Sequence, residues 1–112
     1  MKSDLVFLQH MLDEINFLQK ECTSLTFKDF THNELLMRAA SRSLEIIGEA
    51  SKNLSVEFRK KHKKVEWKKI AGLRDKIIHF YFGVDWEIVW NVIQEKLPEL
   101  KNNIEEILNT PQ

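Results

Sequence analysis

Apolar residues recur every three or four positions along most of the chain, the spacing that places side chains on one face of a helix. The first such run begins at Leu5 and fades around residues 22–24, and Ser3 and Asp4 are suitable N-terminal caps for it. Glycine and proline are scarce, with three and two copies, and regular alternation of β-branched residues is almost absent. The pattern therefore predicts helices throughout.

A second long helix should follow a connector over residues 23–31. Thr31 is a candidate N-cap, and Glu34 lies at the position of its capping-box partner. The apolar pattern then continues as far as Leu54, and residues 55–64 read as a polar, basic turn region.

A third helix is expected from Val65 to about Phe82, ended by Gly83 as a left-handed cap. Asp85 would cap a fourth helix, and Pro98 could begin a short last one. Together these elements predict an all-α, antiparallel bundle of four to five helices. With 112 residues, the chain is expected to form a single domain over positions 1–112.

Two apolar stripes run along the predicted third helix. The core-facing stripe consists of Ile70, Leu73, Ile77 and Phe80. A second stripe, roughly 100° around the helix, consists of Trp67, Ala71, Arg74, Ile78 and Tyr81. This second stripe needs a second covering surface, which is either another helix of the same bundle or another copy of the chain.

Polar residues on this helix form a candidate site. Arg74 and Tyr81 are seven positions apart and should lie nearly in line, while Asp75 and His79 line the polar edge. Arg74 and His79 would diverge by roughly 140° in a regular helix. A two-fold axis near this edge would bring the Arg74 and His79 of two chains together in one composite site.

Two glycines, Gly48 and Gly72, lie inside predicted helices, where each costs roughly 1 kcal/mol relative to alanine. Close approach of a neighbouring helix is the expected reason for both.

Charge is balanced overall but uneven along the chain. The formal net charge is zero, so the whole molecule has no electrostatic preference for nucleic acid. Between Arg59 and Lys69, however, seven basic residues face a single acid, Glu66. Part of this run is a candidate RNA contact, with a solvated loop as the alternative: Arg59, Lys60, Lys61, Lys63 and Lys64.

The remaining composition excludes several classes of protein. The single cysteine, Cys22, rules out an internal disulfide and fits a reducing compartment. No apolar run is long enough for a membrane span, and the N-terminus does not resemble a signal peptide, so we expect a cytoplasmic protein. His10, His32 and His62 share no metal-ligand spacing with each other or with Cys22, so neither a metal site nor a cofactor is expected.

Arginine and histidine near one another can cleave a phosphodiester. Histidine titrates near neutrality and can move a proton to or from an attacking hydroxyl. Arginine stabilises the extra charge of a pentavalent phosphorane through paired hydrogen bonds. Without carboxylates for magnesium, the nucleophile would be the 2′-hydroxyl of the substrate, which restricts such cleavage to RNA. A helix with one arginine and one histidine is nevertheless usually structural.

The stretch from Trp67 to Phe82 resembles the signature of HepT-like toxins in the HEPN superfamily. That signature is an arginine, four residues, a histidine, any residue and a tyrosine, and here Arg74, His79 and Tyr81 meet it. The resemblance extends to residues 46–50 and to the segment after the motif as far as Pro98, so it covers most of the chain.

The resemblance implies a bundle that dimerises through its motif helices and a metal-independent endoribonuclease with Arg74 and His79 as the catalytic pair. Asp75 matches the polar residue that commonly follows the arginine and would orient His79. The resemblance also implies a minimal nucleotidyltransferase antitoxin that adenylylates Tyr81. Glu49, on the helix expected to face the motif, either positions Arg74 or is a surface acid.

Two other functions remain open. The chain could be a non-catalytic subunit of a nucleotidyltransferase complex that binds a nucleotide or a partner through the same face. It could also be an inert adaptor, in which case it should be a monomer with Tyr81 buried.

Overall fold

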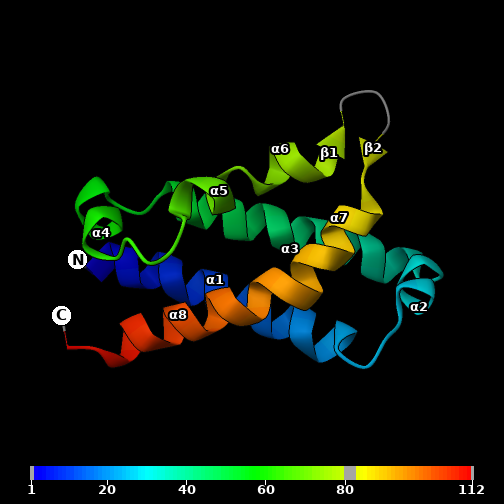
Figure 1. Ribbon diagram of the computed structural model, residues 1–112, viewed down its shortest axis with the longest axis horizontal. Coiled ribbons are helices and arrows are strands. Elements are labelled where there is room, and N and C mark those ends of the chain that lie inside the picture. The colour runs from blue at the N-terminus through cyan, green and yellow to red at the C-terminus, as the bar shows by residue number, and fades with distance from the viewer. Residues whose placement is uncertain (1, 80–82, 112) are drawn as a thin grey trace.

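Three long helical rods pack together because each carries an apolar stripe. In the computed structural model, which describes residues 2–79 and 83–111, α1 (Lys2–Cys22) lies antiparallel to α3 (Glu34–Lys52) (Figure 1). The third rod also runs antiparallel to α1 and consists of α7 (Trp86–Asn91), η1 (Val92–Lys96) and α8 (Leu97–Asn109). Fully buried residues at their contacts include Leu8, Ile15, Leu44, Ile47 and Ile104.

Short elements complete the bundle. They are α2 (Phe27–Thr31), α4 (Val56–Lys61), α5 (Trp67–Ala71), α6 (Leu73–Ile77), β1 (Ile78–His79) and β2 (Gly83–Val84). Figure 1 shows α5 and α6 lying along α3, with the two strands rising beyond α6. The predicted all-α bundle is confirmed. Among the described residues, the strands are limited to this pair of two residues each.

The caps at α2 and α3 differ from those expected. Thr31 is the last residue of α2, and Asn33 caps α3 by accepting a hydrogen bond from the Leu36 N–H at 3.0 Å. The capping box occurs earlier, where Thr26 and Asp29 exchange side-chain and backbone hydrogen bonds at the start of α2. The prediction was wrong because this box starts a short helix inside the expected connector, and Thr31 ends it.

Asp4 is a second corrected cap. It lies inside α1 with only 2% of its surface exposed. Its carboxylate accepts hydrogen bonds from the backbone N–H of Ser55 at 2.7 Å and from the Ser55 hydroxyl at 2.9 Å. Ser55 in turn caps α4 by accepting from the Phe58 N–H. Through these hydrogen bonds, Asp4 links the start of α1 to the start of α4.

Pro98 lies in the first turn of the last helix, α8, as predicted, and α8 follows η1 directly, without a loop between them. The preceding η1 is a π-helical turn in which the Leu97 N–H reaches back to the Val92 carbonyl. A proline ring in a regular α-helix clashes with the carbonyl four residues earlier, here that of Gln94. The π-helical turn lies immediately before Pro98, so the regular α-helical hydrogen-bond pattern is already interrupted where the proline enters.

Candidate active site

The motif segment is divided where one long helix was expected. α5 ends and α6 begins at Gly72, which takes φ −87° and ψ 5°. α6 then ends at Ile77, so the predicted helix from Val65 to Phe82 is wrong in length and continuity. Leu73 and Ile77 are buried. Arg74 lies on the outer side of α6 with 57% of its side chain exposed.

His79 lies on a strand. β1 pairs antiparallel with β2, with His79 opposite Gly83, and the Asp85 N–H donates to the Ile77 carbonyl at 2.7 Å. Gly83 does adopt the expected positive φ, 77°, but within this strand pair and not as a helix cap. The strand pair ends immediately before α7, which Asp85 caps as predicted by accepting from the Ile88 N–H.

These strands remove the helical geometry assumed for the motif. The 140° divergence of Arg74 and His79 and the shared stripe of Arg74 and Tyr81 both required an unbroken helix. The structure describes the backbone of His79 but not its side chain, and Tyr81 lies outside the described residues. The second apolar stripe also changes, because Trp67 is 4% exposed and is covered within its own chain.

The position of α5 against α3 is set by two contacts. The Ser51 hydroxyl donates to the Trp67 carbonyl at 3.0 Å. One turn earlier on α3, a Cβ added to Gly48 would lie 3.2 Å from the Ile70 carbonyl oxygen. The expected close approach is thus confirmed at Gly48. At Gly72, by contrast, the nearest atoms are backbone oxygens of its own α5, so the prediction of a neighbouring helix was wrong there.

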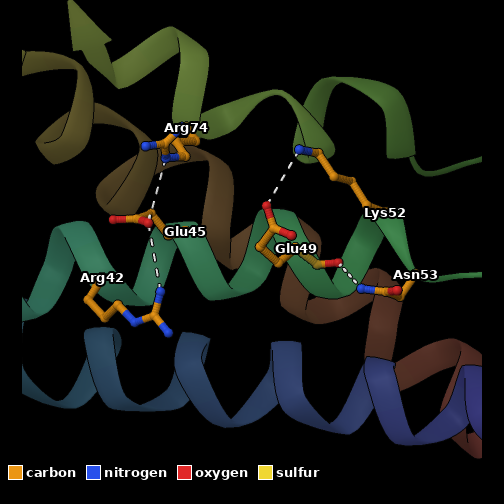
Figure 2. Close-up of polar contacts among 6 residues, drawn as sticks. All are labelled: Arg42, Glu45, Glu49, Lys52, Asn53 and Arg74. Carbon is orange, nitrogen blue, oxygen red and sulfur yellow. Dashed lines mark hydrogen bonds and ion pairs between the residues drawn. The ribbon is translucent and has the colours of Figure 1, made fainter.

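The next contact in this antiparallel register involves Arg74 (Figure 2). Its Nε lies 3.7 Å from Oε2 of Glu45, and the same oxygen is 3.7 Å from Nη1 of Arg42. Glu49, which the sequence suggested as the partner of Arg74, instead pairs with Lys52 at 3.5 Å. Sequence reasoning therefore missed Glu45 and Arg42. A signal was present, because Glu45 and Glu49 are four residues apart and occupy the same side of α3.

A groove borders this cluster. It has a volume of about 570 Å³ and lies between α3 and the segment that joins β2 to α7. Its lining consists of Glu34, Met37, Arg38, Ser41, Arg42, Glu45, Val84 and Trp86. Arg38 is engaged by Glu34 at 2.8 Å, so the groove combines paired charges with a half-buried apolar wall. Asp75, the proposed support for His79, is exposed on α6.

The basic run lies at the other end of α3. Arg59, Lys60 and Lys61 belong to α4, beside the start of α1, whereas the strands rise beyond α6 (Figure 1). Lys63 and Lys64 follow α4, and Lys64 pairs with Glu106 at 3.3 Å. A shallow groove of about 790 Å³ has a largely basic lining from α4 and α5: Arg59, Lys60, Lys63, Lys68 and Lys69 with Val56, Val65, Glu66 and Trp67.

Other chemistry is limited in the described ranges. Burial, reinforced by the charge of Glu21, raises the pKa of the Cys22 thiol to about 11, which disfavours a reactive thiolate. No group of three or more histidine, cysteine, aspartate or glutamate side chains lies close enough to hold a metal ion in residues 2–79 and 83–111. Within those same ranges, no helix has both the length and the apolar character needed to cross a membrane.

Comparison with known proteins supports the resemblance seen in the motif. Residues 11–107 match the family described as ribonuclease HepT-like. A candidate RNase of Caldanaerobacter subterraneus subsp. tengcongensis is 52% identical over 108 residues, which cover 96% of each chain. One from Methanocaldococcus jannaschii is 44% identical over 90% of this chain and 80% of its own.

A further relative carries the family name itself. It is a candidate ribonuclease HepT of Thermococcus cleftensis, 37% identical over 90% of this chain and 92% of its own. No solved structure matches the chain significantly. With the family match spanning nearly the whole bundle and the motif inside it, the chain belongs to the ribonuclease HepT-like family.

Proposed function

We propose that the protein is an RNA-cleaving enzyme, a metal-independent endoribonuclease that acts as the toxin of a toxin–antitoxin pair in the cytoplasm. The observation that carries this proposal is the Arg74, His79 and Tyr81 motif inside the segment that matches a ribonuclease family. The exposed guanidinium of Arg74 supports it, because a phosphate of a polymeric substrate can approach that side chain from solvent.

The proposed chemistry uses the substrate's own nucleophile. The 2′-oxygen attacks the adjacent phosphorus while its proton leaves, and the bond from phosphorus to the 5′-oxygen breaks as that oxygen gains a proton. His79 serves as the base for the 2′-hydroxyl or as the acid for the 5′-oxygen. Arg74 binds the phosphorane oxygens and offsets their charge. The products carry a 2′,3′-cyclic phosphate and a free 5′-hydroxyl.

The proposed active form is a homodimer. Two copies related by a two-fold axis beside α6 and the strand pair would place the Arg74 of one chain near the His79 of the other. The location of both residues at one edge of the bundle supports this arrangement, since α6 runs directly into β1.

Regulation would act on Tyr81. A minimal nucleotidyltransferase partner would transfer AMP from ATP to the Tyr81 hydroxyl, whose oxygen loses its proton and displaces pyrophosphate. The AMP adds bulk and negative charge two residues from His79. The phosphate of the AMP would compete with RNA for the Arg74 guanidinium. Co-expression with such a partner, followed by mass measurement of the intact chain, should show an added AMP that is absent from the Tyr81→Phe variant.

RNA beyond the cleaved bond would follow the basic groove at α4 and α5. Lys68 and Lys69 line that groove, and α5 leads through Gly72 into α6 and Arg74. Phosphate contacts from Arg59, Lys60, Lys61, Lys63 and Lys64 would supply affinity that does not depend on sequence.

The central test is cleavage of RNA in excess EDTA. The wild type should cleave and yield cyclic phosphate ends, whereas His79→Ala and Arg74→Gln should lose at least a hundredfold in rate. His10→Ala and Lys28→Gln are controls, because both residues are exposed on other helices and lie outside the groove beside Arg74, and they should retain activity. A requirement for metal, or full activity in His79→Ala, would contradict the mechanism. Intact RNA together with a stable nucleotidyltransferase complex would instead favour the non-catalytic subunit.

A further inference from the structure

Glu45 is the acidic residue that reaches the motif arginine in the described part of the chain. Its Oε2 lies 3.7 Å from Nε of Arg74 and 3.7 Å from Nη1 of Arg42 (Figure 2). The Glu45 side chain is 28% exposed, against 57% for Arg74 and 67% for Arg42. The carboxylate is therefore the most enclosed member of the cluster, held between two more exposed cations.

The backbone fixes which acid reaches Arg74. Ser51 contacts the Trp67 carbonyl, and Gly48 lies against the carbonyl of Ile70. The two segments are therefore antiparallel, and each step of three residues back along α3 corresponds to a step of three residues forward along α5. The next step brings Glu45 level with Leu73, the residue immediately before Arg74. Glu49 lies four residues back along the rod, about 6 Å from Glu45 along the helix axis. These backbone contacts bring Glu45, and not Glu49, level with the start of α6, where Arg74 lies.

We propose that Glu45 is a positioning residue for Arg74 in RNA cleavage, with Arg42 holding the carboxylate from its other side. Contact through Nε orients the guanidinium plane and leaves the two terminal nitrogens to bind phosphate oxygens. The inference rests on the proposed function, in which Arg74 binds the phosphorane. It adds a residue outside the motif, on a different helix, that sets the direction of the motif arginine.

The pair should matter for cleavage and little for folding. All three side chains retain solvent contact, and ion pairs of this kind contribute little to stability. A misdirected guanidinium, in contrast, reduces the rate strongly because the transition state depends on its placement. This difference separates a positioning role from a structural one.

The first experiment observes Arg74 directly, without RNA. The chain has four arginines, so its Nε–H signals form a small set in a nitrogen–proton NMR spectrum, and Arg74→Lys identifies the relevant one. Glu45→Gln should shift the Arg74 signal, whereas Glu49→Gln, the matched control one turn along α3, should leave it in place. An unchanged Arg74 signal in Glu45→Gln would overturn the inference even if the protein cleaves RNA.

The second experiment measures kcat and KM separately in excess EDTA. Glu45→Gln should lower kcat about tenfold without raising KM, because loss of a carboxylate removes repulsion of phosphate while Arg74 loses its orientation. Glu45→Asp should recover part of kcat, and Glu49→Gln should match the wild type. Thermal unfolding of each variant should be unchanged, which excludes a loss of folded protein.

The outcomes separate the two claims. If the wild type cleaves RNA but Glu45→Gln and Glu49→Gln behave alike, the positioning role is wrong and the proposed function stands. If Glu45→Gln shifts the Arg74 signal but the wild type leaves RNA intact, the endoribonuclease proposal is wrong and the catalytic role of Glu45 with it.

Discussion

His62, in the turn after α4, is a histidine outside the motif whose surroundings affect its titration. Its ring packs against Phe58 with centroids 4.5 Å apart, and its Nε2 is buried without a hydrogen-bond partner among the described residues. Burial, with a smaller contribution from the charge of Lys61, lowers the pKa of His62 below its ordinary value of 6.5. The folded protein therefore favours the neutral ring.

This shift predicts a loss of stability in acid. Below pH 6.5 the unfolded chain binds a proton at His62 more readily than the folded chain does. The free energy of unfolding should then fall as the pH drops from about 7 towards the lowered pKa. Urea unfolding across this range should show a shallower decline in His62→Gln than in the wild type. His10→Gln, on the exposed side of α1, is the control and should keep the wild-type slope; equal slopes in all three proteins would contradict the prediction.

The choice between Glu45 and Glu49 shows the limit of sequence reasoning at a single residue. Both are glutamates on the same side of α3, and both could reach a neighbouring helix. Which of them contacts Arg74 depends on the axial register of α5 against α3. The contact of Gly48 with the Ile70 carbonyl helps to set that register. Periodicity identifies the buried face of a helix, but it contains no information about the axial register of one helix against another.

At the level of elements, the long helices could be predicted and the motif segment could not. The apolar spacing located α1, α3 and the rod from α7 to α8, because each buries a stripe of three- and four-residue period. From Ile77 to Phe82, however, every residue but His79 is β-branched or aromatic, and such residues favour strands as well as buried helix faces. Pairing of β1 with β2 decides between the two, and periodicity within one segment contains no information about that pairing.

Gly48, inside α3, and Gly72, between α5 and α6, provide a test of how α5 is held against α3. Gly48→Ala should lower the free energy of unfolding by about 1 kcal/mol, because overpacking against backbone exceeds the gain in helix propensity. The new Cβ would lie 3.2 Å from the Ile70 carbonyl oxygen, which belongs to the backbone and cannot rotate away. Denaturant unfolding measures this change.

Gly72→Ala is the matched control. A Cβ at position 72 would meet backbone oxygens of α5 at 3.5 and 3.6 Å, which is ordinary contact, and the φ of −87° suits alanine. This variant should be neutral or more stable by up to about 1 kcal/mol, because alanine restricts the unfolded chain. Equal destabilisation by both substitutions would show that close approach to α5 is not what requires Gly48.

Across the whole molecule, basic charge is concentrated in the groove formed by α4 and α5. Lys60 and Lys63 line this groove, whereas Lys20 and Lys28 are exposed at the opposite end of α1 and on α2. The two pairs carry the same charge, so exchanging either pair for glutamine changes the net charge equally. A difference between the two variants therefore reports location and not total charge.

The RNA path predicts a difference in salt dependence. For a single-stranded RNA made uncleavable by a 2′-deoxy substitution, the logarithm of affinity falls with the logarithm of salt concentration by about 0.7 for each phosphate contact. Lys60→Gln with Lys63→Gln should make this slope shallower by about 1.4. Lys20→Gln with Lys28→Gln should leave it unchanged. Titration by fluorescence anisotropy at several salt concentrations measures both, and equal slopes would place the RNA elsewhere.

The π-helical turn at η1 has a consequence for the far end of the molecule. Each residue added to or removed from a helix rotates everything beyond it by about 100°. The turn thus sets the rotation of α7 about the helix axis relative to α8. That rotation determines the side of α7 on which Trp90 packs against Phe30, with ring centroids 5.1 Å apart. β2 leads through Asp85 into α7, so a one-residue deletion in η1 would turn the strand that pairs with His79 away from the bundle edge it now occupies.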